Sequence, residues 1–320
     1  MLPTAPPRQR PFKQVDVFTN EAYFGNPLAV ALDGTGLDET QMLRFANWTN
    51  LSETTFLLPP TPEGQASGAD YRVRIFAPGG EMRFAGHPTL GSCHAWLEAG
   101  GLPHSSRRIV QECAAGLVAI ERDGQRLAFQ APPLKRSAPA AMKLAQVAGA
   151  LGLRSSQLVS AQMLDNGSAW LGILLDDAHT VLQLQPDHLA LKGIGLKVGV
   201  AAFHPSLADA PALIGRSNRE ARAFGQRPAA PAPPLDDAEP VLEVRAFAAP
   251  KGILEDPVTG SLNAYLAQWL MADGHAPARY QAAQGTCLGR AGRVAIYSDA
   301  DGQVWVGGDS VTCLDGTVLL

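Results

Sequence analysis

An internal repeat constrains this chain of 320 residues more than any other feature of its sequence. Residues 73–97 and 244–270 both begin with Val-Arg-x-Phe-Ala and continue with Pro-x-x-Gly-Ser, which His87 precedes in the first copy and Asp256 in the second. Three pairs of segments agree in the same order: 25–30 with 167–171, 73–97 with 244–270, and 116–120 with 292–296. This ordered agreement indicates one duplicated unit with two similar halves, and not a solenoid of short repeats.

Each half has the pattern of several short strands around one helix. The predicted strands are rich in β-branched or aromatic residues and bounded by Gly, Pro or Asp: 71–76, 117–121, 241–247, 293–297 and 304–306. We expect one helix to begin after His87 and the other after Asp256, with a proline at each first helical position and Asp256 as an N-cap. The helix bodies, near 88–99 and 257–272, are apolar around most of their circumference, which predicts that strands surround them.

The boundary between the halves is predicted in the proline-rich stretch 131–140. This division gives three parts: a tail at 1–11, an N-terminal half at 12–132 and a C-terminal half at 133–320. The last strand is a candidate to pack back on the first half. Amphipathic stretches predict outer helices near 38–49, 140–151 and 209–224, and the proline-rich run at 228–234 predicts a surface loop.

Composition and charge disfavour several classes of protein. The net charge is −4 and 18% of residues are charged, so the chain has no overall positive field for nucleic acid or an anionic membrane. No apolar stretch is long enough to span a bilayer, and residues 1–11 lack the apolar core of a secretory signal, so we expect a cytoplasmic protein. The four cysteines form no CxxC pair and are expected to be reduced and buried.

The two helix starts are candidate anion sites, because free backbone N–H groups and the helix dipole point outward there. Duplication supplies two such starts, and pseudo-symmetry would let them face each other around a small carboxylate-bearing molecule. Ordinary helix capping is the alternative for each start. Glu53, flanked by hydroxyls ahead of a strand, is either a solvated edge residue or, if buried beside His87, an acid and base.

Several short segments resemble motifs of known chemistry but lack a feature that the chemistry requires. The glycines at 193–199 resemble a dinucleotide-binding fingerprint, but an extended segment follows where a helix is required. Residues 285–289 resemble a nucleophile elbow around Cys287, but the hydrolase order needs a later histidine and the last one is His275. His87 and His94 have no third ligand at a suitable spacing, so no metal is expected.

The ordered motifs resemble the PhzF family of phenazine-biosynthesis-like proteins over residues 15 to 318. The matching segments are Val-Asp-Val-Phe-Thr at 15–19, Gly-Asn-Pro-Leu-Ala-Val at 25–30, Asn-Leu-Ser-Glu-Thr-Thr-Phe at 50–56, Ala-Gly-His-Pro-Thr-Leu-Gly at 85–91, Glu-Asp-Pro-x-Thr-Gly-Ser at 255–261, Gln-Gly at 284–285 and Val-Gly-Gly at 306–308. The resemblance implies an α+β, diaminopimelate epimerase-like fold of two pseudo-symmetric halves. Each half is a curled, mainly antiparallel sheet around a central helix, with the active site between them.

The resemblance also implies an isomerase like the family's type member, which acts on trans-2,3-dihydro-3-hydroxyanthranilate without a cofactor. Glu53 would be the acid and base that moves a proton in a small, cyclic, carboxylate-bearing metabolite, assisted by His87 and Asp256. The residues implied to bind substrate are Asn26, Ser52, Gly86, Gly260 and Ser261. A homodimer is expected on the same ground.

The sequence is also compatible with other functions. One is a non-catalytic ligand-binding or interaction protein on the same fold. A second is an amino-acid epimerase or racemase, although related racemases use two opposed cysteines where this chain has His87 and Asp256. A third is a hydrolase that uses Cys287. Leu262 and Asn263 stand where the family has small residues, which leaves the substrate unresolved.

Overall fold

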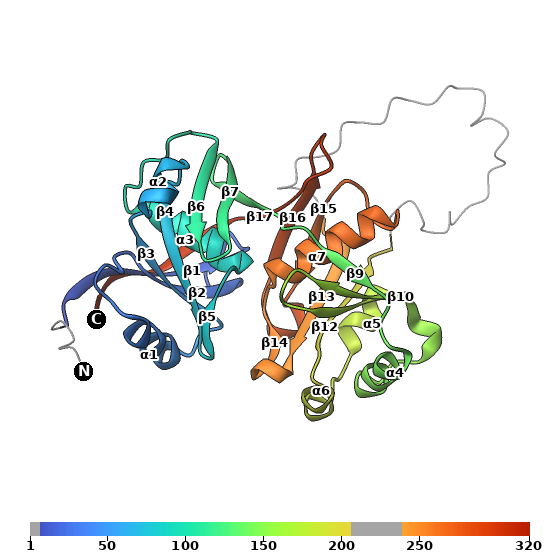
Figure 1. Ribbon diagram of the computed structural model, residues 1–320. Helices are drawn as coiled ribbons and strands as arrows, with labels where there is room; N and C mark the ends of the chain where they lie inside the picture. Colours follow the sequence, from blue (N-terminus) through green and yellow to red (C-terminus); the bar gives the residue numbers. More distant parts are fainter. Residues whose placement is uncertain (1–6, 206–238) are drawn as a thin grey trace, which may run out of the picture.

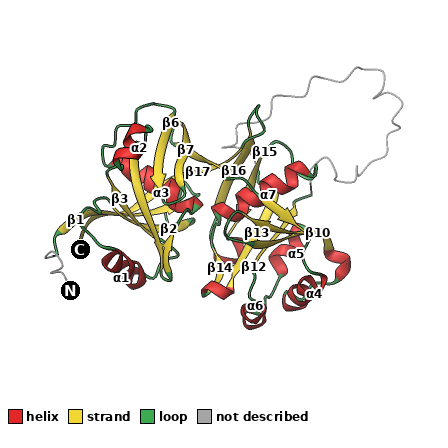
Figure 2. Cartoon of the chain, viewed as in Figure 1, coloured by secondary structure: helices red, strands yellow, loops and turns green. Residues whose placement is uncertain are grey.

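The computed structural model describes residues 7–205 and 239–320, which form two lobes side by side (Figure 1). The helix expected at 209–224 and the loop expected at 228–234 lie outside the described residues. No helix in the described ranges is long and apolar enough to cross a membrane. Helices α3 and α7 lie within the two lobes, and the other helices lie further out (Figure 2).

The first lobe is a strongly curved sheet around helix α3 (Gly86–Glu98). Its strands, in order of pairing, are β18 (Ser310–Leu319), β1 (Gln9–Val17), β2 (Asn26–Ala31), β3 (Thr54–Leu58), β4 (Tyr71–Ala77), β6 (Arg108–Cys113), β7 (Gly116–Asp123) and β8 (Arg126–Gln130). The pairs β2–β3 and β4–β6 are parallel and the others antiparallel. A short strand, β5 (Gly80–Met82), forms a hairpin with β4. Helices α1 (Glu39–Thr49) and α2 (Pro62–Ala66) complete the lobe.

The second lobe repeats this arrangement around helix α7 (Gly260–Ala272). Its strands, in order of pairing, are β9 (Lys135–Ser137), β10 (Leu158–Asp165), β11 (Trp170–Leu175), β12 (Lys197–Phe203), β13 (Leu242–Ala248), β15 (Arg279–Gln284), β16 (Gly292–Ser298) and β17 (Val304–Gly308). The parallel pairs are again the third with the fourth strand and the fifth with the sixth. Strand β14 (Ile253–Asp256) pairs with β13 as β5 does with β4. Strand for strand, the two lobes therefore have the same order and direction, as the sequence repeat predicts.

The equivalent strands β8 and β17 join the two lobes. They pair antiparallel, with Phe129 opposite Val306, so the hydrogen bonding continues from one lobe into the other. An antiparallel pair of equivalent strands places a pseudo-twofold axis between them. After β17 the chain returns to the first lobe, where β18 pairs with β1 from Gln9–Leu319 to Val17–Ser310.

The two lobes differ in what covers their outer surfaces. Helix α1 covers the first lobe through Met42, Phe45 and Ala46, which pack with Phe56 and Phe76 of β3 and β4. Among the described residues, the second lobe carries three helices there: α4 (Ala141–Ala150), α5 (Ala178–Gln183) and α6 (His188–Ile194). An apolar cluster lies between these helices and strands β11, β12 and β13. Strand β11 is accordingly buried along its whole length.

The central helices are buried because apolar or small residues surround them, as the sequence pattern predicts. In α7, Leu262, Leu266 and Trp269 have no exposed surface, and burying each such side chain stabilises the fold by about 1.5–3 kcal/mol. In α3, Leu90 and Cys93 are equally buried. One apolar core contains residues of both helices.

The starts of the two helices differ from the sequence expectation. Helix α3 begins at Gly86, ahead of His87, and α7 begins at Gly260, so neither proline occupies the first helical position. Asp256 ends strand β14 and is not an N-cap; Thr259 is the residue that precedes α7. The cause is tertiary, since the Asp256 carboxylate binds side chains and is not aimed at the helix amides. The structural counterpart of His87 is therefore Ser261, and the sequence match with Asp256 is out of register.

The cysteines follow the sequence expectation only in part. All four are free, and Cys93 and Cys113 are buried. Cys287 is exposed and Cys313 half-buried, so the expectation of burial is wrong for these two. Cys287 lies in the short 3-10 turn Thr286–Leu288, and Cys313 lies in β18 at the edge of the sheet. Strand edges and tight turns leave side chains partly in solvent, which composition alone does not reveal.

Candidate active site

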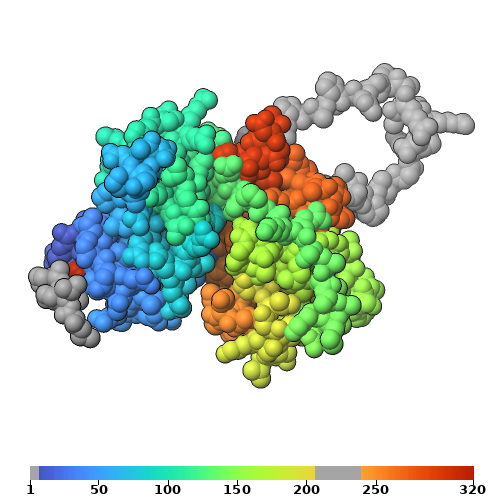
Figure 3. Space-filling model, in the orientation of Figure 1, coloured from blue at the N-terminus to red at the C-terminus, as the bar shows by residue number. Residues whose placement is uncertain are grey.

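Gly86 and Gly260, the first residues of α3 and α7, lie against each other. A Cβ atom built on Gly86 would lie 3.1 Å from the carbonyl carbon of Gly260, and one built on Gly260 would lie 3.2 Å from the Gly86 Cα. Any larger residue at either position would push the helices apart. The N-cap residues Ala85 and Thr259 make no side-chain cap hydrogen bond to any described residue, so first-turn amides of both helices remain available. The two helix starts are thus brought together, as expected, and Figure 3 shows a groove between the two lobes. Anion binding by these helix starts stays a prediction.

Glu53 lies beside His87 at this junction. It immediately precedes β3, and its Oε2 atom is 3.4 Å from Nε2 of His87, the second residue of α3. The two side chains are only 14% and 5% exposed. Neither of these two atoms has a hydrogen-bond partner among the described residues. The solvated alternative for Glu53 is therefore wrong, and burial beside His87 is confirmed.

Burial controls the protonation of this pair. Desolvation, with a smaller contribution from the negative Asp256, raises the pKa of Glu53 from 4.5 to about 8. Desolvation lowers the pKa of His87 from 6.5 to about 3. Near neutral pH the carboxyl group thus carries a proton and the imidazole does not. A carboxylic acid whose pKa is near the working pH can both give and take a proton.

Asp256 is held between the two lobes by hydrogen bonds. Its Oδ2 accepts from Thr259 Oγ1 at 2.5 Å, and its Oδ1 accepts from Asn26 Nδ2 at 3.1 Å. Asn26 belongs to β2 of the first lobe and also donates to the Val258 carbonyl at 2.8 Å. Burial raises the pKa of Asp256 to about 6 against the opposing effect of these hydrogen bonds. Asn26 therefore orients the Asp256 carboxylate and the turn that follows it, and its predicted contact with substrate stays a prediction.

Gln284 supports the same turn from β15. Its Nε2 donates to the Asp256 carbonyl and to Thr259 Oγ1, and its Oε1 accepts from Thr259 N and Asn263 Nδ2. Asn263 also donates to the Thr259 carbonyl at 3.0 Å. Asn263 is therefore a member of the network that positions Asp256. The sequence contains Gln284 in a family motif but offers no local sign of this role.

Lys197 is the site residue that sequence reasoning missed. It begins β12, and its Nζ lies 2.6 Å from Ser168 Oγ and 4.4 Å from the centre of the Trp170 ring. Burial, with a smaller contribution from Lys251, lowers its pKa from 10.5 to about 8, against opposing effects that include those of Asp256 and Glu53. A single lysine at the start of a strand belongs to no known motif. Only its position within the repeat could have identified Lys197 as a site residue.

The remaining predicted residues lie around this junction or near it. Ser261 is the second residue of α7 and is partly exposed, and Ser52 precedes Glu53 and is also partly exposed.

Neither helix start carries a cysteine. Cys93 lies mid-way along α3, where burial raises the pKa of its thiol to about 12. Within the described residues, no group of three or more His, Cys, Asp or Glu side chains could hold a metal ion.

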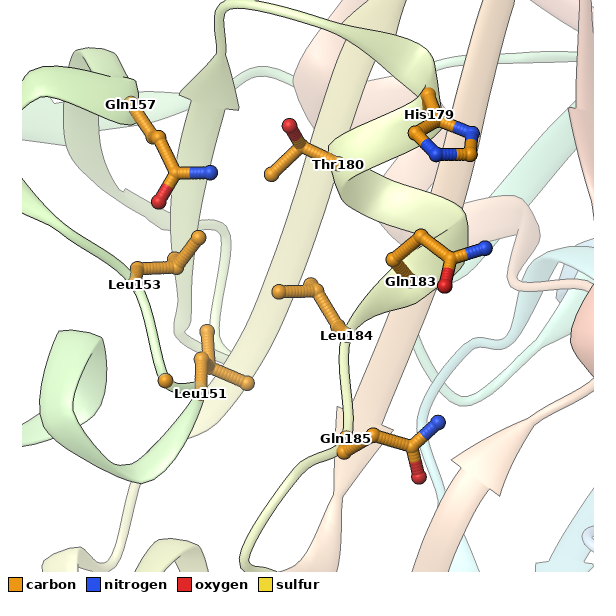
Figure 4. Close-up of a pocket in the computed structure, with 9 residues that line it drawn as sticks. Leu151, Leu153, Gln157, His179, Thr180, Gln183, Leu184 and Gln185 are labelled. Atoms are coloured by element: carbon orange, nitrogen blue, oxygen red, sulfur yellow. The ribbon is translucent and has the colours of Figure 1, made fainter.

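A separate hollow lies on the outer side of the second lobe. It has a volume of about 410 Å³ and lies between the end of α4, the 3-10 turn Ser155–Gln157 and α5 (Figure 4). Its lining contains leucines, glutamines and a single histidine: Leu151, Gly152, Leu153, Gln157, His179, Thr180, Gln183, Leu184 and Gln185. It includes none of the residues at the junction of the two helix starts.

The chain is similar to known proteins both in sequence and in structure. A family model for phenazine biosynthesis-like proteins matches residues 15–316. The chain is 34% identical to antisense-enhancing sequence 1 of Schizosaccharomyces pombe, over 95% of this chain and 97% of the relative. It is 29% identical to the trans-2,3-dihydro-3-hydroxyanthranilate isomerase of Pseudomonas chlororaphis, over 96% and 98%. The crystal structure of a PhzF-family protein from Bacillus anthracis superposes with a TM-score of 0.76 at 20% identity, covering 98% of this chain and 100% of that one. This likeness confirms the predicted fold.

Proposed function

Since this chain belongs to the phenazine biosynthesis-like (PhzF) family and is an isomerase, we propose that it moves a proton between two carbon atoms of a small metabolite. The metabolite carries a carboxylate and is cyclic, like the dihydro-hydroxyanthranilate named for the bacterial relatives. The double bond shifts as the proton moves, so the reaction needs an acid and base but no cofactor. The proposed enzyme is cytoplasmic and dimeric, on the family resemblance.

One observation carries this proposal: the Glu53 side chain is largely buried beside His87, and its Oε2 atom has no hydrogen-bond partner among the described residues. Its Oε2 and the His87 Nε2 lie 3.4 Å apart, and neither has a hydrogen-bond partner among the described residues. Burying two polar atoms without partners is costly, and active sites are where such costs are tolerated. With a pKa near 8, Glu53 can remove a proton from one carbon as the carboxylate and return it to another as the acid.

The surrounding groups have distinct roles in this scheme. His87, uncharged, orients the Glu53 carboxyl and accepts or donates one hydrogen bond to the substrate. Asp256, aligned by Asn26 and Thr259, holds a polar group of the substrate on the side of the second lobe. The first-turn amides of both helices and the Ser261 hydroxyl hold the carboxylate, where the helix dipoles favour negative charge. Donors fixed in this way stabilise charge that develops as the proton leaves.

Exchange of substrate hydrogen with heavy water tests the role of Glu53. We expect the wild-type protein to incorporate deuterium into trans-2,3-dihydro-3-hydroxyanthranilate or into one member of a panel of cyclic carboxylates, measured by mass spectrometry. Glu53→Gln should lower this exchange by about 10³-fold or more while the circular dichroism spectrum is unchanged. The matched control is Glu243→Gln, since Glu243 is also a buried glutamate and its partners, His204 and Thr286, are outside the site. Undiminished exchange in Glu53→Gln would remove Glu53 from the mechanism.

A further inference from the structure

Lys197 is a partly buried cation at the junction, and the proton transfer proposed above does not use it. We propose that its ammonium group binds the carboxylate of the substrate from the side of α7, and so restricts the site to anionic ligands. This inference rests on the proposed function, because it assigns a ligand contact within the same site. Its support comes from the repeat, from the contacts of the ammonium group and from the charges around it.

The repeat places Lys197 at the position equivalent to Glu53. The segments 25–30 and 167–171 correspond, so Ala29 of β2 is equivalent to Leu171 of β11. Ala29 pairs with Thr54 in the parallel pair β2–β3, and Leu171 pairs with Val198 in the parallel pair β11–β12. Glu53 and Lys197 immediately precede these two partners, one in each lobe.

The same correspondence extends to the neighbouring residues. Asn26, which fixes Asp256, is equivalent to Ser168, which fixes Lys197. His87, beside Glu53, is equivalent to Ser261 at the start of α7. Pseudo-symmetry therefore puts Lys197 on the α7 side of the helix junction as Glu53 lies on the α3 side. One lobe thus presents an acid to the junction of the helix starts, and the other lobe presents a cation.

The contacts of Lys197 leave its charge without a counter-ion. Among the described residues, its ammonium donates to the neutral hydroxyl of Ser168 at 2.6 Å and lies over the Trp170 ring at 4.4 Å, and no carboxylate forms an ion pair with it. A cation taken out of water is unfavourable unless an anion or several hydrogen bonds compensate it. Two of the three ammonium hydrogens remain for a further acceptor. The structure therefore holds a cation in place with its charge available to a ligand.

The more distant charges fit the same role. Asp165, Asp256 and Glu53 attract the ammonium group without contacting it, and Lys251 repels it. Because Glu53 is protonated near neutral pH, it does not neutralise Lys197 while the site is free. A substrate carboxylate held by the helix amides would supply the missing negative charge at the point where both helix dipoles also favour it.

Two probes of nearly equal shape separate charge recognition from general fit: 2-aminobenzoate, which is an anion, and 2-aminobenzamide, which is neutral. Binding is measured by calorimetry for the wild type, Lys197→Met, Lys197→Arg and the surface control Lys192→Met. Lys197→Met should weaken 2-aminobenzoate by about tenfold or more and leave 2-aminobenzamide within about twofold. Lys197→Arg, which keeps the charge, should stay within about threefold of the wild type for both probes. Equal losses for both probes, or no loss, would overturn the proposal. It would also be overturned if Lys197→Arg weakened 2-aminobenzoate as much as Lys197→Met does.

A second measurement needs no ligand. If the charge of Lys197 is uncompensated, Lys197→Met should raise the unfolding temperature of the free protein at pH 7, and this gain should shrink toward pH 10 as the wild-type ammonium loses its proton. Lys192→Met should cause no such change. An unchanged or lowered unfolding temperature in Lys197→Met would overturn the claim even if neither probe binds. Glu53→Gln, in contrast, should bind 2-aminobenzoate as the wild type does, so loss of the proposed catalysis and loss of the proposed anion contact are separate results.

Discussion

The two lobes of this protein share a scaffold and differ in chemistry. Within the residues that the structure describes, each has eight main strands in the same order, one hairpin strand and one buried helix of 13 residues. At equivalent positions in the pairs β2–β3 and β11–β12, the first lobe has Glu53, just before β3, and the second has Lys197, the first residue of β12. At the helix starts, His87 corresponds to Ser261. Duplication thus supplies two anion-binding helix starts, and divergence at a few equivalent residues turns a symmetric scaffold into an asymmetric site.

Burial shifts the pKa values of Glu53 and Lys197 in opposite directions. Burial raises the pKa of Glu53 and lowers the pKa of Lys197, so the same cause favours the neutral form of each. Glu53, with its proton near His87, is suited to transfer it. Lys197, with Ser168 and Trp170 around its ammonium group, is suited to bind an anion.

Exchanging the two charged residues is the strongest test of the chemical difference between the two lobes. The double variant Glu53→Lys with Lys197→Glu keeps the net charge and the pair of equivalent positions, but it moves the carboxyl group away from His87. We expect deuterium exchange into substrate to fall by about 10³-fold, with no recovery relative to Glu53→Gln. Exchange within tenfold of the wild type, in a variant with an unchanged circular dichroism spectrum, would show that the two lobes are chemically equivalent.

The pH dependence of stability should have opposite signs for the two residues. The folded chain keeps a proton on Glu53 that the unfolded chain releases, so Glu53 lowers stability as pH rises from 4.5 to about 8. The folded chain releases a proton from Lys197 that the unfolded chain keeps, so Lys197 lets stability increase as pH rises from about 8 to 10.5.

Denaturant titrations across this pH range test both signs. The difference in free energy of unfolding between Glu53→Gln and the wild type should grow by roughly 2–4 kcal/mol between pH 4.5 and 8. The difference between Lys197→Met and the wild type should shrink by about 1–3 kcal/mol between pH 8 and 10.5. Parallel curves for wild type and variant would mean that the residue concerned has an ordinary pKa in the folded chain.

Substitutions at the two contacting glycines should have similar effects on stability, although the residues around the two glycines differ in chemistry. Gly86→Ala and Gly260→Ala each place a Cβ within 3.2 Å of backbone atoms of the other helix, so each should lower the free energy of unfolding by about 1–3 kcal/mol. Gly149→Ala is the matched control, because Gly149 lies in α4 with no atom within 4 Å of a Cβ, and it should gain about 0.5–1 kcal/mol. Guanidinium unfolding measures all three, and a neutral Gly260→Ala would show that the helix starts are not in tight contact.

Particular residues show how far local sequence patterns reach in this protein. The strands at 71–76, 117–121, 293–297 and 304–306 were predictable because alternation and bounding turn residues act within a few residues of each other. Glu53, His87 and Asp256 were identifiable as candidates because family motifs surround them. The start of α7 was not predictable, since Asp256 is held by Asn26, which is 230 residues away, and not by the helix that follows.

The duplicated scaffold can be read from the sequence: two similar sets of strands, two apolar helices, and a few polar residues near the starts of those helices. The protonation and the contacts of those polar residues, in contrast, depend on the tertiary structure. The pKa values of Glu53, His87 and Lys197 depend on burial in the folded chain, and the equivalence of the Glu53 and Lys197 positions depends on the pseudo-twofold axis through β8 and β17. Strand and helix patterns are local and survive in the sequence, whereas desolvation and juxtaposition exist only once both lobes have folded against each other.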